Sequence, residues 1–158
     1  MKVVRPAALA LMVLAAIVFV PGRATASDKS DVMAVINGAV AFFNKGDMKG
    51  WEALCTSNAP VVSNIAPFEY STCADWWNAH AAFIKKNGVS GEKVALQTPW
   101  TFSISGDRAY AAFPASFSYK QKAKTIASGG VLTIALQKTG TGWLMTGWSW
   151  AQRPAGGY

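Results

Sequence analysis

The sequence has few charged residues and very few side chains of the kinds that bind metals or act as nucleophiles. Only 15% of its 158 residues are charged, and it contains one histidine and two cysteines. One histidine and two cysteines do not complete a four-ligand zinc site, and no cluster of acids is present for calcium or a transition metal. No Gly-rich phosphate-binding motif and no nucleophile-elbow motif occur either. The sequence therefore implies no metal and no cofactor.

Apolar and aromatic residues dominate instead. They make up 51% and 12% of the chain, and seven of the aromatic residues are Trp. This composition excludes a disordered, collagen-like or coiled-coil chain. A single globular domain is expected, preceded by a leader.

Residues 1–26 have the features of a secretory signal peptide. Lys2 and Arg5 precede an uninterrupted apolar run over residues 7–20, and Ala24-Thr25-Ala26 is an A-x-A cleavage signal. The apolar run is short for a membrane span, and no later segment approaches that length. We expect cleavage after Ala26 and a periplasmic or secreted mature protein that is not attached to a membrane.

The basic character of the chain depends partly on this leader. Its removal discards three basic residues and no acidic one, which lowers the formal charge from +7 to +4. The remaining basic cluster, Lys120, Lys122 and Lys124, alternates along a predicted hairpin tip without aromatic residues that could stack on bases. It is interpreted as a solvated loop that protects a strand edge, and no nucleic-acid partner is expected.

Cys55 and Cys73 both lie in the mature chain and would meet an oxidising compartment. No CxxC motif is present, and the two cysteines fall at the end of one predicted helix and the start of another. A Cys55–Cys73 disulfide is therefore predicted.

The first half of the mature chain is predicted to be mainly helical. Apolar residues over 30–45 recur with helical spacing, and Asp47 is a suitable N-cap for a short second helix. Short strands are expected over 61–62 and 68–70 around Pro67. Thr72 to Asp75 has the capping-box pattern and opens a third helix that ends at Asn87-Gly88.

The second half is predicted to be four long strands. β-Branched and aromatic residues are frequent over 93–105, 108–120, 130–138 and 143–152. The expected turns are Gly106-Asp107, the Lys-rich tip with Ser128-Gly129-Gly130, and Thr139 to Gly142. Short connections imply an antiparallel meander that the helices cover on one face, an α+β domain over residues 27–152 with a frayed tail over 153–158.

This order of elements resembles the nuclear transport factor 2-like (NTF2-like) superfamily, which has a cystatin-like fold and includes SnoaL-like polyketide cyclases and ketosteroid isomerases. The resemblance covers residues 28–152 and is strongest over 106–110, 117–122 and 142–150. It implies a cone in which a curved four-stranded antiparallel sheet, with a short strand pair, wraps around the helices and leaves a pocket open at one end. Relatives often form homodimers through the sheet, so a homodimer is a further expectation.

Aromatic residues are the candidates for lining such a pocket. They are Trp51, Tyr70, Trp76, Trp77 and Trp100. The alternative for each of them is that it only fills the core.

His80 lies on the same face of the third predicted helix as Trp76, Trp77 and Ile84. An inward-facing imidazole could act as a general base near neutral pH or could orient a ligand. The alternative is a partly buried histidine with a satisfied hydrogen bond. No motif supports a Ser-His-Asp triad.

The acidic residues argue against the activity of ketosteroid isomerases. The resemblance places the acidic base of those enzymes where this chain has Ser63 and Asn64, and neither can act as a carboxylate base. Glu69 and Asp75 are the acids near the predicted pocket mouth. Asp75 is also explained by the capping box, and Glu69 is expected to be exposed beside Tyr70.

Two functions remain from these observations. The first is a non-catalytic exported domain that binds a small apolar molecule in an aromatic pocket, and the missing acidic base favours it. The second is a cofactor-independent isomerase, cyclase or dehydratase that uses His80 together with Tyr70, Glu69 or Asp75.

Overall fold

The computed structural model describes residues 26–153. The predicted signal peptide lies almost wholly outside this range, as does the tail after Arg153. Within the range, no helix is long and apolar enough to cross a lipid bilayer. The elements in chain order are α1 (Ala26–Lys45), α2 (Met48–Glu52), β1 (Val61–Val62), β2 (Glu69–Tyr70), α3 (Cys73–Asn87), β3 (Val89–Leu96), β4 (Thr101–Ser105), β5 (Arg108–Gln121), β6 (Lys124–Thr139) and β7 (Gly142–Gln152).

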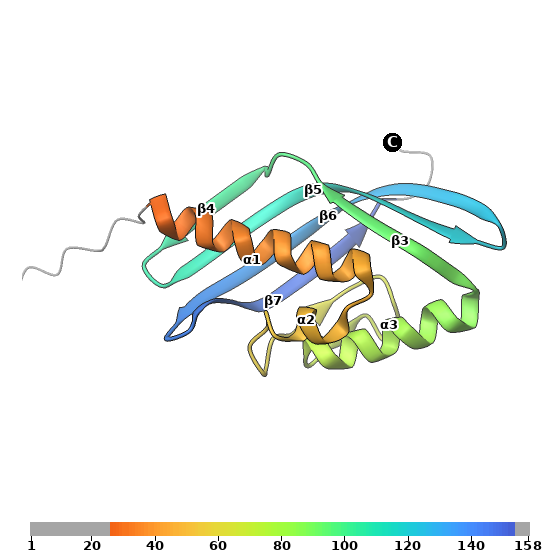
Figure 1. Cartoon of the computed structure of the whole chain (residues 1–158), viewed down its shortest axis with the longest axis horizontal. Coiled ribbons are helices and arrows are strands. Elements are labelled where there is room, and N and C mark those ends of the chain that lie inside the picture. Colours follow the sequence, from red (N-terminus) through yellow and green to blue (C-terminus); the bar gives the residue numbers. More distant parts are fainter. Residues whose placement is uncertain (1–25, 154–158) are drawn as a thin grey trace, which may run out of the picture.

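All strands belong to one curved sheet with the order β2-β1-β7-β6-β5-β3, and β4 also pairs with β5. The long strands are antiparallel to their neighbours, whereas β1 runs parallel to β7. Figure 1 shows α1 lying across the sheet, with α2 and α3 together near one side of it. The expected α+β cone, with its short strand pair, is confirmed.

Helix α1 places one apolar stripe against the sheet. Val32, Ile36 and Ala39, spaced four and three residues apart, are at most 1% exposed and belong to the main core cluster. The helix begins four residues earlier than the apolar pattern predicts. In this added turn, the Asp28 carboxylate lies 2.6 Å from the Lys138 ammonium of β6. The apolar periodicity of α1 does not reveal this first turn, because its contact is with a residue far away in the sequence.

Helix α3 begins and ends where its sequence predicts. The Thr72 hydroxyl accepts a hydrogen bond from the Asp75 backbone N–H at 3.1 Å and donates one to the Asp75 carboxylate at 2.8 Å. At the other end Gly88 adopts φ +62°, a left-handed conformation that costs glycine little. These caps fix both ends of α3 and therefore the positions of its inward-facing side chains.

The predicted strand over 93–105 is wrong as a single strand, because it forms β3 and β4. Both pair with β5, β3 through Leu96 opposite Ala115 and β4 through Thr101 opposite Ala112. Pro99 lies in the break between them, where its missing N–H removes a ladder donor. β3 also begins at Val89, earlier than expected, which adds Glu92 to the sheet.

The predicted turn at Ser128-Gly129-Gly130 is also wrong. Gly130 lies within β6 opposite Ala115, and the hairpin turns instead at Lys122 and Ala123, which both have positive φ. A Cβ on Gly130 would lie 2.5 Å from the Trp150 ring, so glycine is needed there for a close approach. Gly130 therefore makes room for an aromatic side chain of the next strand.

Candidate functional site

A pocket of about 840 Å³, counting the solvent at its mouth, lies inside the cone. Helices α1, α2 and α3 and strands β3, β5, β6 and β7 all contribute to its lining. The lining is mainly aromatic and aliphatic, with a few polar side chains. A mainly apolar lining with a few polar groups is typical of sites for small organic molecules.

Buried tryptophans form the floor of the pocket. Trp51, Trp76 and Trp148 line it and are only 5–7% exposed. Trp148 meets Trp76 edge to face with ring centroids 4.5 Å apart, and it meets Trp51 in a similar geometry at 5.4 Å. The rings come from α2, α3 and β7, so the floor joins all three elements.

Half-buried rings continue the lining toward the mouth. Phe117 and Tyr119 of β5 have centroids 5.3 Å apart, and Trp150 of β7 meets Phe117 at 6.0 Å. Phe83 of α3, 42% exposed, lies at the rim. A ligand would therefore pass between aromatic side chains from opposite sides of the cone.

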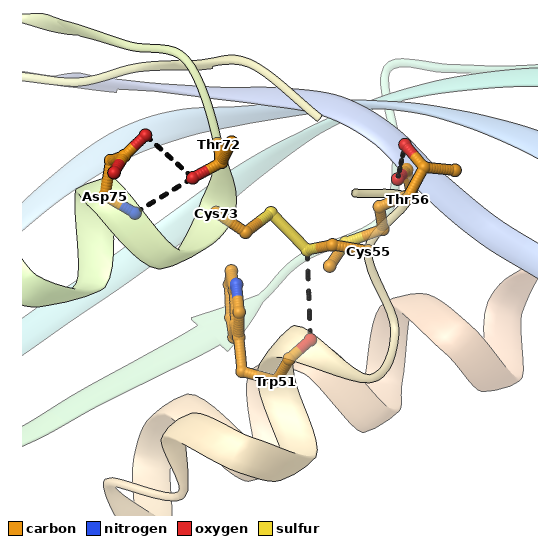
Figure 2. The surroundings of a disulfide bond; sticks show 7 residues. Trp51, Cys55, Thr56, Thr72, Cys73 and Asp75 are labelled. Atoms are coloured by element: carbon orange, nitrogen blue, oxygen red, sulfur yellow. Dashed lines mark hydrogen bonds between the residues drawn. A yellow bond between two sulfur atoms is a disulfide. The ribbon is translucent and has the colours of Figure 1, made fainter. Parts of the chain in front are cut away.

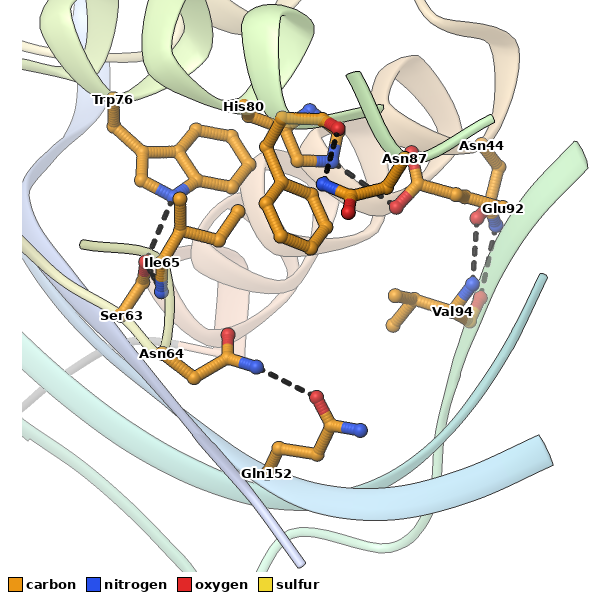
Figure 3. A network of polar contacts seen from close by, with 11 residues as sticks. Asn44, Ser63, Asn64, Ile65, Trp76, His80, Asn87, Glu92, Val94 and Gln152 are labelled. Carbon is orange, nitrogen blue, oxygen red and sulfur yellow. Dashed lines mark hydrogen bonds and ion pairs between the residues drawn. The ribbon is translucent and has the colours of Figure 1, made fainter. Parts of the chain in front are cut away.

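His80 and Glu92 form the polar centre of the lining. His80 Nε2 lies 3.1 Å from Glu92 Oε1, and their side chains are 8% and 13% exposed. The imidazole stacks on Trp76 with centroids 4.9 Å apart and planes 12° apart, and Phe43 lies 5.5 Å away. The hydrogen bond and the two rings hold the imidazole in one orientation at the pocket wall. Figure 3 shows the contact between His80 and Glu92.

Two further polar contacts lie along the pocket lining. Ser63 is buried and accepts a hydrogen bond from the Trp76 indole N–H at 3.1 Å. Asn64 donates its amide N–H to Gln152 Oε1 at 2.6 Å, which links the segment after β1 to the end of β7. Figure 3 shows the Asn64–Gln152 pair across from the His80–Glu92 pair.

The predicted disulfide is confirmed and lies beside the floor of the pocket. Cys55 follows α2 and Cys73 begins α3, and their Cα atoms are 6.6 Å apart. Figure 2 shows the bond next to Trp51, whose carbonyl oxygen lies 3.8 Å from the Cys55 sulfur. The link holds together the two helices that carry Trp51 and Trp76.

The sequence-predicted pocket residues lie in three settings: in the pocket lining, buried outside the lining, and on the surface. Trp51, Trp76 and His80 line the pocket. Trp77 and Tyr70 are buried but lie outside the lining, and the Tyr70 hydroxyl is 2.9 Å from the carbonyl oxygens of both Ile65 and Ala66. Burial raises the pKa of Tyr70 above its usual value.

The expectation that Trp100 lines the pocket is wrong, because its side chain is 70% exposed. Trp100 follows Pro99 in the break between β3 and β4 and lies outside the pocket lining. The break turns the side chain away from the core, and the single strand expected there could not indicate this.

The acids expected near the mouth do not reach the pocket. Glu69 and Asp75 are both exposed and lie outside its lining, and Asp75 is held by the Thr72 cap. Glu92, which the sequence reasoning missed, supplies the carboxylate instead. The signal was present, because Glu92 alternates with the inward-facing Val94 and Leu96, but it required β3 to begin before residue 93.

Metal ligands do not gather in the site. Across residues 26–153, no group of three or more His, Cys, Asp or Glu side chains lies close enough to hold a metal ion. The polar groups of the pocket are suited to hydrogen bonding, to binding a charge and to proton transfer.

Comparison with known proteins identifies the fold. The sequence matches no protein-family model and no curated protein. Solved structures match well: an NTF2-like superfamily protein from Salmonella enterica has a TM-score of 0.72 at 16% identity, covering 85% of this chain and 96% of its own. A ketosteroid isomerase-like protein from Erwinia carotovora has a TM-score of 0.68 at 12% identity, covering 82% and 99%.

A protein of unknown function with a cystatin-like fold from Nostoc punctiforme is also similar, with a TM-score of 0.65 at 12% identity over 83% of this chain and 95% of its own. These chains agree along nearly their whole lengths. The protein has the NTF2-like fold. Identities this low establish the fold alone, so function has to be argued from the pocket.

Proposed function

We propose that the protein binds a small, largely apolar molecule between the aromatic walls of its cone. The observation that carries this proposal is a pocket lined mainly by aromatic and aliphatic side chains, in which His80 and Glu92 form one polar pair and Asn64 and Gln152 form another. Ring faces supply contact area, and a few fixed polar groups orient a ligand. The disulfide is consistent with a further part of the proposal, that the protein acts in the periplasm or outside the cell.

A neutral dye tests the binding proposal. N-Phenyl-1-naphthylamine, which fluoresces strongly in apolar surroundings, should bind with one site per chain. Val94→Trp adds bulk at the lining, while the backbone bonds of residue 94 to Asn44 are kept. We expect this variant to bind the dye at least about tenfold more weakly, which corresponds to about 1.4 kcal/mol.

Val62→Trp is the matched control, because Val62 is 54% exposed on β1 and lies outside the pocket. It should bind the dye as the unmodified protein does. Equal dye affinity in all three proteins would contradict binding in the cone.

A second function, proton transfer at a carbon beside a carbonyl group, is favoured by the His80–Glu92 contact. A histidine held by a carboxylate in a mainly apolar pocket is suited to general base catalysis. The proton would pass from carbon to His80, and the electron pair would move onto the carbonyl oxygen as an enolate. His80 would exchange this proton with solvent and return one to carbon as the carbonyl group forms again. Ser63 and Asn64, which lack an acidic group, would have no part in this step.

The flat ketone 2-tetralone provides the test of this second function. In deuterated buffer, the protein should accelerate deuterium uptake beside the carbonyl group, and His80→Gln should lower the accelerated rate by about 100-fold. Retained dye binding by His80→Gln would show that its pocket persists. Exchange no faster than in buffer alone would remove the catalytic function and leave the binding function standing.

A further inference from the structure

We propose that the pocket selects a cationic ligand, a protonated or quaternary amine carried on an apolar body, with Glu92 as its counter-charge. The inference rests on the proposed binding function and adds the charge of the ligand to it. It follows from the charges and the ring faces that line the cavity.

The pocket lining contains an acidic side chain without a lysine or arginine to balance it, among the described residues. Among the described residues that line the pocket, Glu92 is the acidic one, and neither Lys nor Arg is present. Lys93, the next residue along β3, is exposed and donates to the Asn44 carbonyl oxygen at 2.7 Å. An anionic ligand would therefore enter an apolar pocket with no cation to meet it and would lie near a carboxylate, which is costly.

The aromatic lining favours the same ligand charge. Phe43, Phe117, Tyr119 and Trp150 line the pocket together with Trp76. The face of an aromatic ring attracts a cation, and aromatic cages that bind quaternary ammonium groups use this attraction together with burial. An amine placed near Glu92 would gain both the carboxylate and neighbouring ring faces.

Displacement of the bound dye by three similar molecules tests the inference. The probes are 2-phenylethylamine, 2-phenylethanol and 3-phenylpropionate, which at pH 7.5 are a cation, a neutral molecule and an anion. We expect the amine to bind about tenfold more tightly than the alcohol, as a favourable charge interaction of about 1.4 kcal/mol would give. The carboxylate should bind most weakly.

Glu92→Gln keeps the shape of the side chain and removes its charge, so amine affinity should fall to that of the alcohol. Glu69→Gln is the control, because Glu69 is exposed on β2 and lies outside the pocket. It should leave all three affinities unchanged. The comparison among the three probes uses the unmodified protein, so the inference can fail even if the Glu92 variant does not fold.

The outcomes separate the two proposals. The cationic preference would be overturned if the alcohol bound as tightly as the amine or more tightly, or if the carboxylate bound most tightly of the three. Either result would leave the binding function intact. An amine preference that survives in Glu92→Gln would also overturn the assigned role of Glu92. If the protein binds neither the dye nor any of the probes, both proposals are wrong.

Discussion

His80 and Glu92 meet because α3 and β3 each direct one polar side chain toward the same point of an apolar wall. Glu92 Oε1 and the Trp76 ring together restrict the imidazole, through a 3.1 Å contact on its edge and a stacked ring on its face. A polar group at such a position is costly to bury unless its hydrogen bonds are satisfied. Each member of the pair therefore satisfies a hydrogen bond of the other within the apolar wall.

Tyr70 gives a residue-scale prediction outside the pocket. Its hydroxyl is 2.9 Å from the Ile65 and Ala66 carbonyl oxygens, just before Pro67. Tyr70→Phe removes this donor, and we expect it to lower the free energy of unfolding by about 1 kcal/mol at pH 7. Urea denaturation measures the difference.

The effect of Tyr70→Phe should depend on pH. Burial raises the pKa of Tyr70 above its usual 10.0, so its contribution to stability is fully present below that value and is lost as the pH rises through the raised pKa. The gap between the two proteins should therefore close above pH 10. Tyr110→Phe, at a side chain that is 45% exposed, serves as the control. A gap that widens in alkali would contradict this account of Tyr70.

At the scale of elements, the disulfide joins the end of α2 to the start of α3 across 18 residues. Closing a loop of this length restricts the unfolded chain, and we expect loss of the bond to lower the free energy of unfolding by about 3 kcal/mol. Urea denaturation with and without reductant measures this loss. The Cys55→Ala, Cys73→Ala protein should unfold like the reduced protein and should not respond to reductant. Identical unfolding of the oxidised and reduced protein would contradict the prediction.

Elements whose ends depend on local chemistry were predictable from the sequence. Asp47 caps α2 by accepting a hydrogen bond from Gly50, and Thr72 and Gly88 set the ends of α3. These contacts join residues three or four positions apart, so a short stretch of sequence contains the whole signal. The pairing of Cys55 with Cys73 was also predictable, since no other cysteine was available.

Features that depend on distant partners were missed. Gly130 is typical of a turn when only its neighbours in sequence are considered. In the structure, the Trp150 ring of the next strand lies too close to residue 130 for a side chain there. Glu92 is typical of a loop residue when only its neighbours in sequence are considered. Its position in the pocket depends on the pairing of β3 with β5 and on the contact with His80 of α3. Half of the polar pair at the candidate site was therefore visible in the sequence, because only His80 shares a helical face with the Trp residues.

At the scale of the whole molecule, the pocket exists because a curved sheet bends around α1 without closing on it (Figure 1). Strands β5 and β6 are 14 and 16 residues long, so they extend beyond the small side chains Ala109, Ala111 and Ala115 that pack in the core. Farther along β5, Phe117 and Tyr119 face the cavity. The filled part of the cone supports the fold, and the wider part is the aromatic pocket.

The indole N–H signals of the seven Trp residues provide the most direct measurement of ligand binding in the cone. In ¹H–¹⁵N spectra recorded during titration with N-phenyl-1-naphthylamine, signals from the pocket residues Trp51, Trp76, Trp148 and Trp150 should shift together and saturate at one dye per chain. The signal of the exposed Trp100 should stay in place. Shifts confined to Trp100, or no saturable shift among the pocket signals, would contradict the proposal that the cone binds small apolar molecules.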